Sequence, residues 1–182
     1  YEPLVQGAGG MVMYEAAALN SLLKLCTQYN CLTIADEVMT GFGRTGKFLA
    51  GDYIEQKPDI ICLSKGITGG FMPLGVTACT QQVFNAFISD DKTRTFYHGH
   101  SYTANPLACA AANASLDILE KQETWQNIEM ISGFFAAMKK RLENHPALLN
   151  CRHTGAILAL EIKTPEGTSY LNPLSEKITA FF

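Results

Sequence analysis

Two residues in this sequence combine a reactive or charged group with a position directly after a short apolar run. Lys65 follows the run at residues 60–63 and precedes several glycines, and Asp36 follows the run at residues 31–35. Lysine is among the residues least often buried, so a lysine at the end of a core strand is either an exposed tip or a chemically used amine. The pair predicts amine chemistry supported by a carboxylate, or else an ordinary salt bridge.

Both apolar runs are typical of buried strands, and their separation suits one strand–crossover–strand unit. Parallel strands joined in this way present their carboxyl ends at one edge of the sheet, so Asp36 and Lys65 are expected to stand together there. Pyridoxal phosphate needs a lysine amine for its Schiff base and an acid beside its pyridine nitrogen. The sequence therefore predicts a pyridoxal phosphate site, although spacing alone leaves the salt bridge open.

The remaining pattern predicts an α/β fold. Helical periodicity indicates helices at residues 14–29, 107–119 and 122–144, a short helix at 81–88 and a last one at 173–182. Strands are expected near residues 4–5, 74–80 and 156–162, and a glycine-rich loop at 40–46 carries Arg44. We predict two domains, with residues 1–121 in a large domain and 122–182 forming a connecting helix and the start of a smaller one.

Composition excludes several classes of partner. A net charge of −3 and a pI near 5.8 offer no basic patch for nucleic acid or an anionic membrane, and no apolar run is as long as a membrane span. The six cysteines show no CxxC spacing, which predicts small core residues in a reducing, cytoplasmic setting. His98 and His100 have no third ligand cluster nearby, so no metal site is expected.

The sequence resembles the class III, fold type I, pyridoxal-phosphate-dependent aminotransferases. The matching segments are collinear and cover nearly the whole chain: EPLVQGAGGM at 2–11, ADEV at 35–38, TGFGRTGK at 40–47, LSKGITGG at 63–70, HGHS at 98–101, NPLACA at 105–110 and GAI at 155–157. QGAGGM and NPLACA favour the members that transfer the amino group of S-adenosylmethionine to 8-amino-7-oxononanoate in biotin biosynthesis. The resemblance implies part of a mainly parallel large domain with flanking helices and the start of a smaller α+β C-terminal domain.

The resemblance also implies roles for individual residues. Lys65 is implied to form the Schiff base with the cofactor and then to move a proton as a free base. Asp36 is implied to pair with the pyridine nitrogen and keep it protonated, which strengthens the ring as an electron sink. Val38 is implied to pack against the ring, because it points to the same face as Asp36 in an extended chain.

In this family the segment that follows His-Gly reaches into the neighbouring subunit, which implies a homodimer with its active site at the interface. Ser101 is implied to bind the cofactor phosphate beside His100, where typical members carry Pro-Thr, and Gly99 is implied to border the substrate. Arg44 is expected near the substrate or as a solvated group. Glu2 is expected to pair with charged groups of the site or to be structural.

Two alternatives to the biotin reaction remain. The first is another class III ω-aminotransferase acting on ornithine, 4-aminobutyrate or a polyamine, and the second is an inactive structural or assembly module. Tyr1 and Phe182 do not resemble natural termini, so a fragment is expected. The family's N-terminal half supplies another phosphate-binding loop and an aromatic residue that stacks on the ring, so this chain alone is predicted to be inactive.

Overall fold

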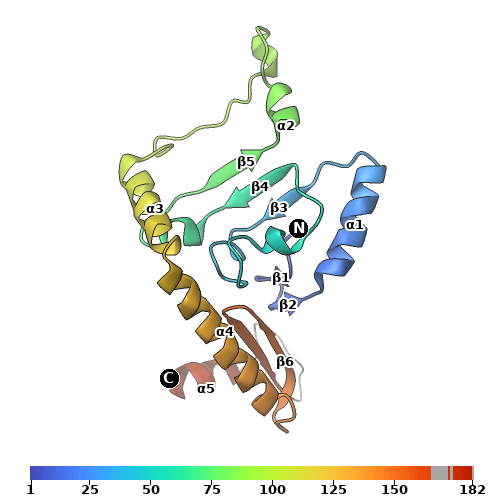
Figure 1. Cartoon of the computed structure of the whole chain (residues 1–182), viewed down its shortest axis with the longest axis vertical. Coiled ribbons are helices and arrows are strands. Elements are labelled where there is room, and N and C mark those ends of the chain that lie inside the picture. Colours follow the sequence, from blue (N-terminus) through green and yellow to red (C-terminus); the bar gives the residue numbers. More distant parts are fainter. Residues whose placement is uncertain (165–171, 173, 182) are drawn as a thin grey trace.

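The structure is a computed structural model that describes residues 1–164, 172 and 174–181. Figure 1 shows a small central sheet, an arm that projects beyond it, and a long helix that leads to a separate hairpin. The elements in chain order are β1 (Val5–Gln6), β2 (Val12–Met13), α1 (Ala16–Gln28), β3 (Ile34–Asp36), the 3₁₀ helix η1 (Ala50–Tyr53), β4 (Ile60–Leu63), η2 (Lys65–Thr68), β5 (Val76–Cys79), α2 (Gln81–Asn85), η3 (Lys92–Arg94), α3 (Pro106–Leu119), α4 (Gln122–Leu142), β6 (Leu148–Thr154), β7 (Ile157–Ile162) and α5 (Leu174–Phe181).

The central sheet has the strand order β3-β4-β5. Strands β3 and β4 pair in parallel, with Asp36 opposite Cys62, which confirms the predicted parallel pairing. Strand β5 instead runs antiparallel to β4, so the described sheet is mixed and not mainly parallel. The connection between them contains the 3₁₀ helix η2 and no α-helix, whereas a parallel pair is usually joined by an α-helical crossover.

The predicted helices are present with small shifts at their ends. Asn105 caps α3 by accepting hydrogen bonds from the amides of Leu107 (2.9 Å) and Ala108 (3.5 Å), and Pro106 occupies the first turn. The predicted helix at 81–88 is shorter in the structure, where α2 ends at Asn85. The predicted helix at 173–182 corresponds to α5, and its residues 173 and 182 lie outside the described residues.

The buried core of the described chain is small and lies between α1, the β1–β2 hairpin and the tip of the β6–β7 hairpin. One face of α1 contributes to it, while Leu22 and Leu25 on another face are 54% and 51% exposed. The cluster comprises Leu4, Val5, Leu19, Leu23, Ala50, Ile54 and Ile157. The cysteines were expected in the core, but none of the six is buried and Cys31 and Cys79 are exposed, so that prediction was wrong.

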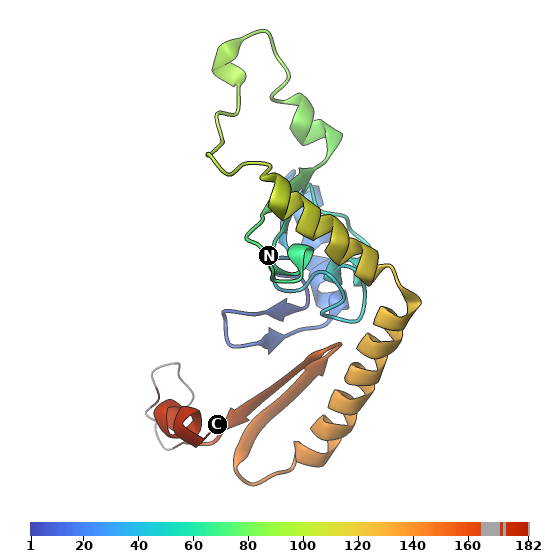
Figure 2. The ribbon, with the colours of Figure 1, turned by 90° about the vertical axis from the view of Figure 1, so that its left-hand side faces the viewer.

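Two hairpins frame this core. The antiparallel β1–β2 hairpin has a glycine-containing turn at residues 7–11. The longer antiparallel β6–β7 hairpin lies along α4 with its tip towards the core (Figure 2). Strand β7 was predicted, whereas β6 was not, because its sequence LLNCRHT lacks a run of apolar or alternating residues. Within the described residues, no helix is long and apolar enough to cross a membrane.

The end of α2 and the segment that follows it form an arm, defined here as residues 84–104, that projects from the sheet (Figure 1). Every residue of the arm is exposed, including the aromatic side chains of Phe96 (68%) and Tyr97 (80%). Its hydrogen bonds are short-range, for example the Thr93 amide to Asp91 Oδ1 at 2.9 Å. The arm therefore gains little stabilisation from packing against the rest of the chain.

Candidate functional site

Lys65 lies immediately beyond β4, where the chain leaves the sheet. The structure forms η2 here, which begins at Lys65 and is followed by Gly69 in the left-handed conformation. Lys65 has φ +46°, a region that costs energy for residues other than glycine and that clusters at functional sites. Ser64 Oγ donates to the Leu74 carbonyl at 2.7 Å, which secures the backbone just before the lysine.

The backbone after Lys65 is held by two neighbouring elements. A Cβ at Gly66 would lie 2.9 Å from Cβ and Cδ2 of Phe42, so only glycine lets the glycine-rich loop pack so closely. Ser115 Oγ of α3 donates to the Gly66 carbonyl at 3.3 Å. The position of Lys65 is thus determined by the sheet, by the loop and by α3.

Asp36 ends β3 at the same edge of the sheet. Its Oδ1 accepts a hydrogen bond from the Val38 amide at 3.0 Å, and its side chain is exposed. Among the described residues, Asp36 and Lys65 form no ion pair, and no hydrogen bond engages Lys65 Nζ. The alternative of an ordinary salt bridge therefore does not describe this edge, and the lysine amine is uncommitted.

Glu37, the next residue, is a carboxylate that the sequence analysis did not single out. It is only 1% exposed and accepts hydrogen bonds from Thr40 Oγ1 (2.5 Å) and from the amides of Ala50 (3.1 Å) and Gly51 (2.6 Å). A buried carboxylate needs such partners, and these ones fold the glycine-rich loop back onto β3. The sequence offers little signal for this role, because the two amide donors lie in η1, far along the chain.

The neighbourhood of Glu37 also perturbs a phenol. Burial, together with the Glu37 carboxylate, raises the pKa of Tyr1 to about 12. Burial likewise raises the pKa of Tyr14 and of Tyr53. These groups keep their protons at neutral pH and act as hydrogen-bond donors, as Tyr53 does to the Thr45 carbonyl at 3.0 Å.

Lys65 lines a pocket of about 180 Å³. Val38 and Met39 form one wall, Arg44 and its loop form another, and Ile128 of α4 and Ala156 of the β6–β7 turn complete it. The structure thus brings together three predicted site residues, Lys65, Val38 and Arg44.

The other predicted residues lie elsewhere. Gly99, His100 and Ser101 are exposed in the arm and are not among the described residues that line the pocket. His100 contacts only its own segment, with its amide donating to Thr103 Oγ1 at 3.1 Å and its Nδ1 accepting from the Tyr102 amide at 3.1 Å. Glu2 makes a structural contact, because its Oε2 accepts from the Gly7 amide at 2.8 Å.

A larger cavity of about 810 Å³ lies between α4, β6 and the start of α1. It contains none of the residues for which the sequence predicted chemistry. Thr45 Oγ1, which is buried and has no hydrogen-bond partner among the described residues, belongs to its lining. The described residues contain no group of three or more His, Cys, Asp or Glu side chains that could hold a metal ion.

Comparison with known proteins shows the family. A model for aminotransferase class-III matches residues 1–179, so the chain belongs to the class III aminotransferase family, whose members use pyridoxal phosphate. An adenosylmethionine-8-amino-7-oxononanoate aminotransferase from Synechococcus elongatus is 46% identical over 180 residues, which are 97% of this chain and 41% of that relative. The chain thus spans about two fifths of the length of the curated relatives it matches.

Two solved structures support the assignment to this family. The enzyme of the same description from Methanocaldococcus jannaschii superposes with a TM-score of 0.83 at 36% identity, over 88% of this chain and 38% of that one. An (S)-enantioselective omega-transaminase from Thermomicrobium roseum superposes with a TM-score of 0.82, also at 36% identity, over 89% of this chain and 36% of that one.

Proposed function

We propose that this chain forms the lysine-bearing part of a pyridoxal-phosphate-dependent aminotransferase that transfers the amino group of S-adenosylmethionine to 8-amino-7-oxononanoate, giving 7,8-diaminononanoate in biotin biosynthesis. The observation that carries the proposal is the uncommitted Lys65 amine in its pocket, next to the strand that ends in Asp36. The names of the relatives support the substrates.

Lys65 in the pocket and Asp36 at the adjoining strand end fit the cofactor, although Asp36 is not among the described residues that line the pocket. Lys65 offers a free amine and Asp36 a carboxylate whose Oδ2 makes no hydrogen bond within the described residues. Pyridoxal phosphate, when bound, supplies an electron sink for the bond broken at the substrate Cα. Lys65 would hold the cofactor and carry the proton at that carbon, and Asp36 would keep the ring nitrogen protonated.

The remaining predicted residues complete the proposal. Val38 would pack against the ring and Arg44 would contact the substrate from the glycine-rich loop. Gly99, His100 and Ser101 would serve the pocket of a second copy, with Ser101 binding the phosphate, which requires a homodimer. We further propose that residues 1–121 belong to the cofactor-binding domain and that 122–182 connect it to a smaller domain.

The test is an absorbance titration of the full-length protein that contains this chain with pyridoxal phosphate, followed by S-adenosylmethionine. We expect a visible band that is absent in Lys65→Ala and that is bleached by this donor. A band that ignores S-adenosylmethionine but responds to ornithine or 4-aminobutyrate would favour the omega-transaminase alternative, which the Thermomicrobium superposition supports. The absence of a band would favour the second alternative, an inactive structural or assembly module. The 182-residue chain by itself is expected to show no turnover above its Lys65→Ala variant.

A further inference from the structure

We propose that Arg152 of β6, oriented by Glu161 of β7, is a positioning residue for the Lys65 pocket. The inference rests on the proposed function, in which that pocket holds the reacting amine. Neither residue lines the pocket, so any influence must pass through the loops that they hold.

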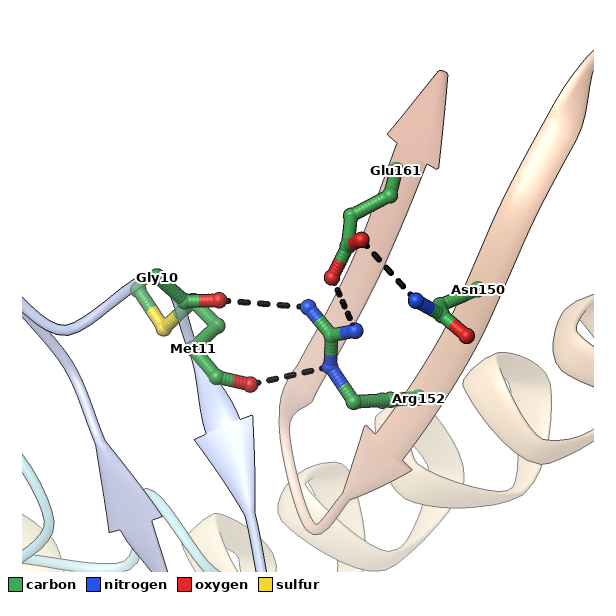
Figure 3. A network of polar contacts seen from close by, with 5 residues as sticks. All are labelled: Gly10, Met11, Asn150, Arg152 and Glu161. Atoms are coloured by element: carbon green, nitrogen blue, oxygen red, sulfur yellow. Dashed lines mark hydrogen bonds and ion pairs between the residues drawn. The ribbon is translucent and has the colours of Figure 1, made fainter. Parts of the chain in front are cut away.

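All three guanidinium nitrogens of Arg152 are engaged (Figure 3). Nε donates to the Met11 carbonyl at 3.0 Å, Nη2 donates to the Gly10 carbonyl at 3.1 Å, and Nη1 pairs with Glu161 Oε1. Asn150 Nδ2 donates to the other oxygen of Glu161 at 2.9 Å. The Arg152 and Glu161 side chains are 21% and 23% exposed, so this charge-assisted network is partly shielded from water and its hydrogen bonds fix the plane of the guanidinium.

The two carbonyls belong to the turn of the β1–β2 hairpin, which leads to the pocket. The amides of Gly10 and Met11 donate to the Gly7 carbonyl at 3.4 and 3.3 Å, so Arg152 holds the turn from its outer end. A Cβ at Gly7 would lie 3.0 Å from Cε of Met39, which places this turn directly behind Met39. Met39 in turn lines the Lys65 pocket.

The tip of the β6–β7 hairpin, which carries Arg152, contacts the glycine-rich loop that lines the pocket. A Cβ at Gly155 would lie 2.2 Å from the carbonyl carbon of Thr45, and the Ala156 amide donates to the Arg44 carbonyl at 2.9 Å. The β6–β7 hairpin therefore contacts the glycine turn behind Met39, through Arg152, and the glycine-rich loop that lines the pocket, through its tip. Weakening the Arg152 network therefore increases the mobility of the backbone at Met39, while the hairpin tip keeps its contacts with the glycine-rich loop.

The test is amide hydrogen exchange of the 182-residue chain, compared with Glu161→Gln and the milder Arg152→Lys. We expect the amides of residues 7–11 to exchange about tenfold faster in Glu161→Gln, and those of residues 38–42 about threefold faster, while β4 is unchanged. Glu55→Gln is the matched control, because it removes the exposed Lys24–Glu55 pair (3.3 Å), which is remote from the pocket.

Residues 38–42 decide the outcome, since Arg152 does not touch them. Faster exchange confined to residues 7–11 would make Arg152 a local structural residue and overturn the proposal, as would no change or an equal rise in all regions. Because this measurement needs no cofactor, its failure is distinct from failure of the proposed function, which would appear as a missing absorption band in the unsubstituted protein. If both hold, the apparent affinity for pyridoxal phosphate should fall about fivefold in Glu161→Gln and stay constant in Glu55→Gln.

Discussion

The Lys65 pocket and the arm carry the predicted functional residues under opposite physical conditions. Around the pocket, a buried Glu37, a glycine packed on Phe42 and the tip of the β6–β7 hairpin hold the backbone in place. The arm is exposed along its whole length and is held by short-range hydrogen bonds. The chain thus holds one part of the proposed site in place by itself and presents another part without support.

This difference suggests what the arm requires. Phe96 and Tyr97 expose large apolar rings, and Tyr102 is 75% exposed. A concentration of exposed aromatic groups is typical of a surface that another chain covers. Within the proposed homodimer, the pocket of one copy and the arm of the other would complete each other.

The largest effect is expected where the pocket walls meet the hairpin tip. Gly155 has φ +52°, and Gly155→Ala places a Cβ against the backbone of Thr45 and Gly46. We expect the free energy of unfolding to fall by about 4 kcal/mol, because the backbone of one segment must move. Urea denaturation measures this loss. Gly133→Ala in α4, where nothing lies within 4 Å, is the control and should gain up to about 1 kcal/mol. Equal effects in both variants would contradict the close contact.

A smaller loss is expected from the buried carboxylate beside the pocket. Glu37→Gln replaces an oxygen that accepts backbone hydrogen bonds by an amide group that donates, so we expect about 2 kcal/mol less stability in urea denaturation. Glu55→Gln, at an exposed carboxylate, should change stability by less than about 0.5 kcal/mol. If the two variants were indistinguishable, Glu37 would not organise the loop.

Tyr1 is expected to make the stability of the chain depend on alkaline pH. Because burial and Glu37 raise its pKa from 10.0 to about 12, the unfolded chain loses this proton first as pH rises. Its contribution to stability is fully present below pH 10 and is lost between pH 10 and about 12. We expect the urea midpoint to fall more steeply across this window in the unsubstituted chain than in Tyr1→Phe. Parallel curves would show that Tyr1 titrates alike in both states.

The smallest effect on stability is expected in the arm. Ser101→Ala should change the free energy of unfolding by less than about 0.5 kcal/mol, because the side chain is exposed and forms no hydrogen bond with the part of the chain that the structure describes. The same variant should lower the apparent affinity for pyridoxal phosphate about tenfold, as measured by the absorbance titration, if Ser101 binds the phosphate of a partner's cofactor. A loss above about 1 kcal/mol would instead mean that the arm packs within its own chain.

Local pattern was sufficient for the helices and for the parallel pairing of β3 with β4, because apolar periodicity and strand spacing are local properties. It failed for β6, whose polar residues become strand only by pairing with β7, and for the direction of β5. It also placed the cysteines in a core that the described chain does not provide for them.

The sequence by itself determined the chemistry available to this protein: a carboxylate after one strand, an amine after the next, a glycine-rich loop with an arginine, and a family pattern that joins them. Only the tertiary structure decided which of these groups meet. Lys65, Val38 and Arg44 share a pocket, while Gly99, His100 and Ser101 do not reach it. Contacts such as Gly155 on Thr45, or Arg152 on Gly10, join segments far apart in the chain, and no local propensity encodes them.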